Sequence, residues 1–193
     1  STMYRAFELH KAKRYAEALD AFLIVGVNVD PSKSEVERQV YVCSQTMACA
    51  CHYSIEQYPE GYQLAKKLIA GKLEDSEKKD IYHYYVLNGY MIVCDFIKKD
   101  ENGNAEYQRG RELLLEIAPY ADEELKGYVL PKIPLTWYFE GASNFEKQMF
   151  EEALVCFNNA SAIIPDGLEK LISHASGQCF SISLTMFIIT GIV

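Results

Sequence analysis

Residues 134–165 read PLTWYFEGASNFEKQMFEEALVCFNNASAIIP, and this stretch decides the fold class. Within it, Phe150, Ala153, Phe157 and Ala160 follow one another at intervals of three or four residues. Such intervals place side chains on one face of an α-helix, and a small residue on that face lets a second helix approach closely. The stretch therefore predicts two helices packed against each other.

The same spacing occurs three more times in the chain. The small residues of the four signatures are Ala18, Ala65, Gly110 and Ala153, which recur at intervals of 47, 45 and 43 residues. A long stretch with helical periodicity precedes each signature, and proline, glycine, asparagine or aspartate separates the helices. We therefore expect a repeat array with one helix pair per unit, at about 1–31, 35–72, 77–118 and 134–165.

The last unit resembles a tetratricopeptide repeat, in which two antiparallel helices pack through small residues and a proline closes the unit. The resemblance rests on the order and spacing of Trp137, Gly141, Phe150, Ala153, Phe157, Ala160 and Pro165. The first unit is similar through Ala6, Tyr15, Ala18, Phe22 and Asp30-Pro31. The units are longer than the usual 34 residues or so, as in long-helix variants among bacterial proteins of this family. The resemblance implies an all-α fold, a right-handed solenoid of antiparallel helix pairs.

Composition and charge narrow the choice of compartment and partner. The chain has 193 residues, with 19 Lys and Arg against 27 Asp and Glu, and a formal net charge of −8. No basic run could track a phosphate backbone, so we expect no nucleic-acid partner. The sequence shows no basic segment followed by an apolar leader, and we expect a cytoplasmic protein.

No motif with a catalytic or metal-binding mechanism is found. Cys43, Cys49, Cys51 and His52 suggest zinc, but on a helix Cys49 and Cys51 point about 200° apart, at roughly 100° per residue. We expect reduced, buried thiols instead. His174 and Cys179 lack an orienting third group, and no glycine-rich phosphate loop is present. The sequence thus predicts no enzyme, metal or cofactor.

The resemblance also indicates where a ligand would bind. In some members of the family, Lys, Arg and Asn on the inner faces of the first helices hold the terminal carboxylate of a peptide. Here the matching positions are mostly apolar or aromatic: Met3, Phe7, His10, His83, Val86, Tyr90, Tyr138 and Phe145. Such a stripe is either core or a peptide-binding groove. The resemblance implies a non-catalytic protein- or peptide-binding scaffold; the alternative is a structural or oligomerisation module of a larger signalling or effector protein.

The C-terminal segment differs from the rest of the chain, because residues 171–193 contain no Asp, Glu, Lys or Arg. His174, Gln178 and several Ser, Thr and Gly interrupt it, so we do not expect a membrane anchor. Alternation at 180–186 also permits a strand. We expect residues 166–193 to start a fifth helix pair or to form an apolar capping tail, through which two copies of the chain could form a homodimer.

Overall fold

The computed structural model describes residues 1–163, and in this range all regular structure is helical, which confirms the all-α class. The α-helices are α1 (Thr2–Lys11), α2 (Tyr15–Asn28), α3 (Glu35–Ser54), α4 (Tyr58–Ile69), α5 (Asp75–Ile97), α6 (Tyr107–Ile117), α7 (Glu123–Glu146) and α8 (Phe150–Ile163), with a short 3₁₀ helix η1 (Ala118–Tyr120) before α7. The expected fifth pair, capping tail and dimer segment at 166–193 lie outside the described residues.

Three of the helix pairs are joined by the same tight turn. Lys13, Glu56 and Gln148 each have a φ near +60°, the left-handed conformation that often ends a helix. In each turn the next residue donates its backbone N–H to a carbonyl five residues earlier: Arg14 to Leu9, Gln57 to His52 and Met149 to Asn144, all at 2.9 Å. The next helix begins one residue later. The pair α5–α6 differs, because residues 98–106 form a longer loop between its helices.

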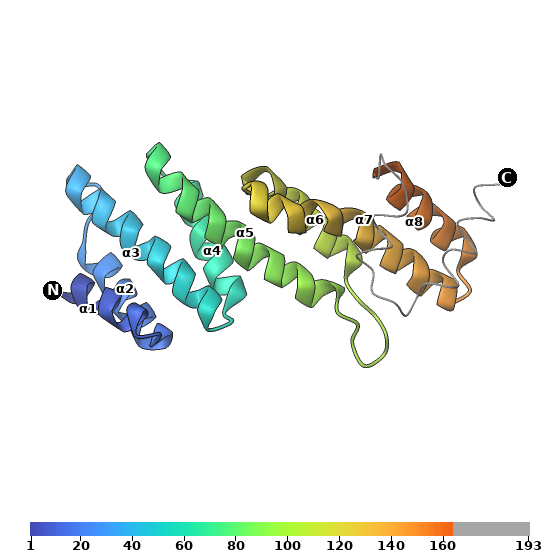
Figure 1. Ribbon diagram of the computed structural model, residues 1–193, viewed down its shortest axis with the longest axis horizontal. Coiled ribbons are helices and arrows are strands. Elements are labelled where there is room, and N and C mark those ends of the chain that lie inside the picture. The colour runs from blue at the N-terminus through green and yellow to red at the C-terminus, as the bar shows by residue number, and fades with distance from the viewer. Residues whose placement is uncertain (164–193) are drawn as a thin grey trace.

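The helices follow one another along the long axis of the molecule, from the N-terminus to α8 (Figure 1). Each helix packs on the next one in the chain, and α3 also packs on α5, and α5 on α7. The odd-numbered helices α3, α5 and α7 therefore form one continuous face. No helix within residues 1–163 has the length and apolar character needed to cross a bilayer.

The small residues of the four signatures are all buried. Ala18, Ala65 and Ala153 are fully buried. A Cβ on Gly110 would lie 3.0 Å from the side chain of Ile97, so glycine suits the close packing of α6 on the C-terminal end of α5. Two hydrophobic clusters result, one built from α1 to α3 around Phe22 and one from α3 to α7 around Leu114.

Helix α7 departs from the expectation that its helix begins at Pro134. It begins at Glu123, where the Asp122 side chain accepts a hydrogen bond from the Leu125 amide, and it continues through Pro131 and Pro134. Each proline removes one helical N–H donor, which weakens the helix. Leu125, Val129 and Ile133 are buried on one stripe of this segment, and their burial offsets the loss.

The expectation of buried thiols is right for some cysteines and wrong for one. Cys49 and Cys51 are buried, and burial raises the pKa of Cys49 to about 12 and that of Cys51 to about 11. Cys43 is exposed although Val42 and Ser44 on either side of it are buried, because adjacent residues of a helix point about 100° apart. The described cysteines are all free thiols.

Candidate functional site

A pocket of about 330 Å³ lies on the face formed by the odd-numbered helices. Three helices contribute to it: α3 near its C-terminal end, the middle of α5, and the first half of α7. Its lining residues are Tyr53, His83, Val86, Leu87, Tyr90, Met91, Glu124, Leu125, Tyr128 and Val129. We call it the α3–α5–α7 pocket.

The pocket has an apolar floor and aromatic walls. Val86, Leu125 and Val129 are buried and form its floor. Tyr53, Tyr90 and Tyr128 reach it from three different helices, and the rings of Tyr90 and Tyr128 meet at an angle of 65° with centroids 6.4 Å apart. Tyr128 is 57% exposed, an unusually open position for a large aromatic side chain. An apolar body with a polar tip suits tyrosine to recognition surfaces.

Polar groups stand around the pocket. His83 Nδ1 lies 3.4 Å from Asp122 Oδ2, so the residue that caps α7 also contacts α5. The hydrogen bond from the Leu125 amide, followed by the contact with His83, lowers the pKa of Asp122. Glu124 forms no ion pair with any Lys, Arg or His of the described residues. Lys132 places its Nζ 5.7 Å from the centroid of the Tyr90 ring.

Tyr90 is held as a neutral phenol. Burial, together with the neighbouring Cys94, raises the pKa of Tyr90 to about 12. The side chain therefore offers the pocket an uncharged ring face and a hydroxyl group at neutral pH.

Helix α5 is fixed from behind by a cluster of tyrosines around one carboxylate. Glu116 Oε1 accepts hydrogen bonds from the hydroxyls of Tyr62 at 2.5 Å and Tyr85 at 2.7 Å, and from Lys66 Nζ at 2.8 Å. The rings of Tyr62 and Tyr85 are stacked, with centroids 5.2 Å apart. Burial alone would raise the pKa of Glu116, but the three hydrogen bonds outweigh it and lower the pKa to about 2. The cluster joins α4, α5 and α6.

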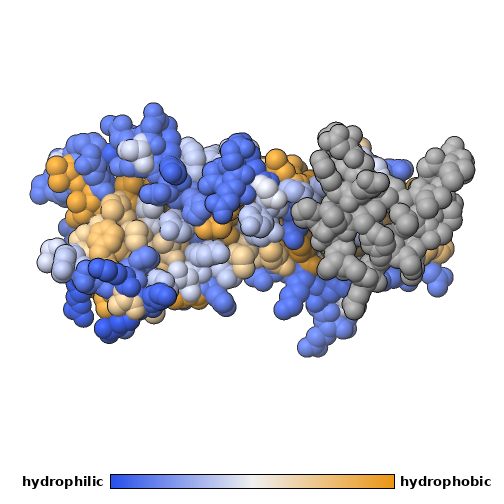
Figure 2. Space-filling model, viewed as in Figure 1, coloured by the Kyte–Doolittle hydropathy of each residue, from blue (hydrophilic) through white to orange (hydrophobic). Residues whose placement is uncertain are grey.

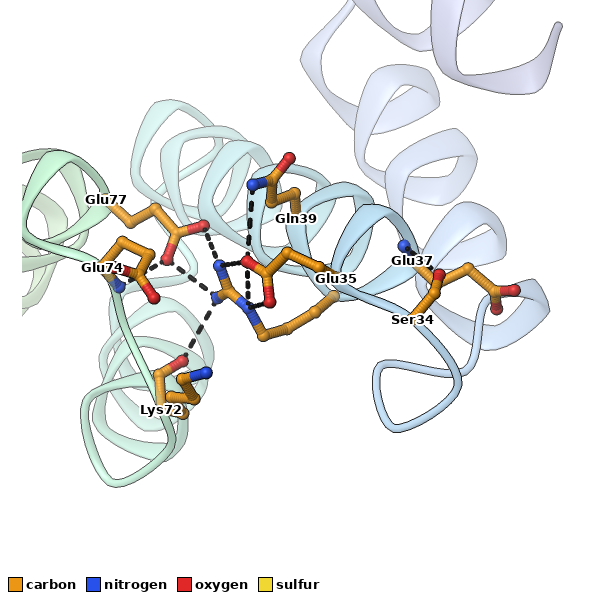
Figure 3. Close-up of polar contacts among 8 residues, drawn as sticks. Ser34, Glu35, Glu37, Gln39, Lys72, Glu74 and Glu77 are labelled. Atoms are coloured by element: carbon orange, nitrogen blue, oxygen red, sulfur yellow. Dashed lines mark hydrogen bonds and ion pairs between the residues drawn. The ribbon is translucent and has the colours of Figure 1, made fainter.

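Helix α3 is tied to the start of α5 by a buried arginine. The guanidinium of Arg38 contacts Glu35 at 2.6 Å, Glu77 at 2.9 Å and the carbonyl of Lys72 at 3.4 Å (Figure 3). Further along the same two helices, Asn88 Nδ2 lies 3.4 Å from the Cys49 carbonyl and 2.9 Å from the Tyr84 carbonyl. These contacts set the position of α3, and thus of Tyr53, relative to α5.

The expected groove residues fall into three groups. His83, Val86 and Tyr90 line the pocket together, although Val86 is fully buried, so it forms floor rather than exposed wall. Met3, Phe7 and His10 lie on α1, where Phe7 packs edge-on against Phe22 and His10 against Tyr15. Tyr138 and Phe145 lie in the second half of α7, where their rings contact Phe157 and Phe150. The structure does not bring these last two groups to the pocket.

Sequence reasoning missed seven of the ten lining residues: Tyr53, Leu87, Met91, Glu124, Leu125, Tyr128 and Val129. Glu124 and Tyr128 belong to the first half of α7, which lies before Pro134 and so outside the helix that the sequence predicts. The spacing of Leu125, Val129 and Ile133 is the signal that could have found this half-helix. Tyr53 lies next to the C-terminal residue of α3. The spacing of apolar residues in this helix does not indicate on its own which way the Tyr53 side chain points.

Comparisons with protein-family models, with curated proteins and with solved structures found no match. Within residues 1–163, no group of three or more His, Cys, Asp or Glu side chains is arranged to hold a metal ion.

Proposed function

We propose that the chain is a helical solenoid of the tetratricopeptide type, which binds a peptide segment of another protein across α3, α5 and α7. The solenoid is supported by the packing of each helix on its neighbour in the chain and by the three equivalent turns. In such an array the first helices of successive pairs form one extended face, and a peptide can lie along it. The proposed role is non-catalytic.

The observation that carries the proposal is the α3–α5–α7 pocket. Its exposed tyrosine, Tyr128, stands over a floor of buried aliphatic side chains, so a partner residue could bury apolar surface there without displacing the core. Rigid aromatic side chains lose little conformational entropy on binding and dominate many interfaces. A pocket built from three helices also holds its shape, because each helix is fixed by its own contacts.

The proposal is tested with peptides selected from a random display library against the whole chain. Tyr128→Ala should weaken the binding of the selected peptides by about tenfold or more, which is the effect of losing a central aromatic contact. Tyr4→Ala is the matched control, since Tyr4 is a similarly exposed tyrosine on α1, at 67%. Dissociation constants are measured by fluorescence anisotropy. Equal effects of the two substitutions, or selection of no peptide, would refute binding at this pocket.

A second candidate function is self-association, and one observation favours it. Hydrophobic side chains are exposed at the end of the molecule that carries α1 to α3 (Figure 2), including Val27 at 85% and Val36 at 69%. An exposed apolar patch often marks a contact with another protein. Sedimentation equilibrium over a range of concentrations distinguishes this role. If the wild type forms dimers and Val27→Asp and Val36→Asp make them dissociate, self-association is supported. A wild type that is monomeric at every concentration would exclude it.

A further inference from the structure

The charges around the α3–α5–α7 pocket point to the chemistry of its ligand. Glu124 lines the pocket and is exposed, and it has no cationic partner in the part of the chain that the structure describes. The neighbouring Glu123 differs, because it pairs with Lys126 at 2.7 Å. A carboxylate without a partner beside an apolar pocket is free to pair with a cation that the ligand brings.

The aromatic walls favour the same kind of ligand. Tyrosine ring faces attract ammonium and guanidinium groups, and an aliphatic floor accommodates the methylene stem that carries such a group. One of these rings already makes such a contact, since Lys132 Nζ lies over the Tyr90 ring at 5.7 Å from its centroid. The stem of a lysine or arginine would find Val86, Leu125 and Val129 beneath it and Glu124 at the rim.

We propose that the partner peptide presents a lysine or arginine side chain that enters the α3–α5–α7 pocket, with its stem on the apolar floor, its cationic head between the tyrosines and its charge paired with Glu124. This inference rests on the proposed function and names the residue type that the pocket selects. The net charge of −8 acts in the same direction, because it attracts a basic segment at long range. Lys132 repels a cationic ligand, since it lies over the Tyr90 ring. The Nδ1 atom of His83 is in contact with Asp122.

The test uses capped degenerate peptides with one fixed central residue: lysine, norleucine or glutamate. Norleucine keeps the apolar stem and removes the charge. The lysine pool should bind the wild-type chain about three- to tenfold more tightly than the norleucine pool, as expected for one ion pair and one ring contact near solvent. The glutamate pool should bind more weakly than both.

Two substitutions with opposite expected signs connect this preference to the pocket. Glu124→Gln should bring the lysine and norleucine pools to nearly equal affinity. Lys132→Met should strengthen the binding of the lysine pool by up to about threefold, because a charge of the same sign as that of the peptide lysine is removed. Glu123→Gln is the control, with the same charge change one residue away and outside the pocket lining. It should leave the preference for lysine intact.

The outcomes distinguish failure of the cationic ligand from failure of the peptide-binding pocket. Equal binding of the lysine and norleucine pools, both weakened by Tyr128→Ala, would overturn the cationic ligand and keep the peptide-binding pocket. A preference for lysine that Glu123→Gln removes as fully as Glu124→Gln would also overturn it, since it would then reflect overall charge. Absence of binding by every pool would overturn both. A preference for lysine that only Glu124→Gln removes supports both.

Discussion

Glu116 joins three helices through a single carboxylate oxygen, and this makes it sensitive to acid. Hydrogen bonds from Lys66, Tyr62 and Tyr85 hold the pKa of Glu116 near 2, below the ordinary value of 4.5. A carboxylate with a lowered pKa in the folded state stabilises the fold above its ordinary pKa and loses that contribution as the pH falls towards the folded value.

We therefore expect the wild type to be more stable than Glu116→Gln at neutral pH, and this advantage to disappear between about pH 4.5 and pH 2. The side chain is 40% exposed, so solvent screening limits the pH-dependent part to about 1 kcal/mol. Urea unfolding at a series of pH values measures it. Glu112→Gln, one turn earlier on α6, is the control for loss of charge. A constant difference between wild type and Glu116→Gln over this window would contradict the prediction.

Helix α7 contains two glycines in opposite surroundings, which allow packing to be separated from helix propensity. A Cβ on Gly141 would lie 2.7 Å from the ring of Phe157 on α8. A Cβ on Gly127 would meet no atom within 4 Å. Both positions are in the interior of the helix, where alanine is favoured over glycine by up to about 1 kcal/mol.

Gly127→Ala should therefore stabilise the protein by up to about 1 kcal/mol. Gly141→Ala should be the less stable of the two variants by about 1 to 3 kcal/mol, because the ring of Phe157 or the helix itself must shift. Chemical denaturation of both variants beside the wild type gives the comparison. If the two variants are equally stable, the close contact between α7 and α8 is not present in solution.

At the scale of the whole molecule, the two hydrophobic clusters predict regions of separate stability. Phe22 is fully buried in the cluster of α1 to α3, and the cluster from α3 to α7 does not include it. In a chain whose helices pack mainly on their neighbours, damage at one end need not spread to the other.

Phe22→Ala should cost about 3 to 5 kcal/mol within its own cluster. Hydrogen exchange followed by mass spectrometry should then show faster exchange in α1 and α2, with little change in α5 and α6. Leu114→Ala, in the other cluster, should give the reverse pattern. Uniform loss of protection along the chain in both variants would show that the described helices unfold as one unit.

Much of this arrangement could be predicted from the sequence, because buried small residues at helical spacing identify the packed faces. Ala18, Ala65, Gly110 and Ala153 are all buried, and Gly110 packs against α5. The first half of α7 could not be predicted, because a proline in the sequence favours a helix start at Pro134, whereas capping by Asp122 and burial around Val129 outweigh the effect of the prolines. Glu124 and Tyr128 were lost from the site for the same reason.

The two prolines of α7 also bear on how the molecule responds to force. Pro131 and Pro134 have no N–H to donate to the carbonyls of Gly127 and Leu130. One short stretch of α7 therefore lacks two backbone hydrogen bonds of a regular helix. In a row of helices that pack mainly on their neighbours in the chain, we expect a pulling force to act on each helix in turn. The turn of α7 that lacks these backbone hydrogen bonds should unfold first. It directly follows Tyr128 of the pocket. Stretching this molecule would thus loosen the pocket before the tyrosine cluster around Glu116 gives way.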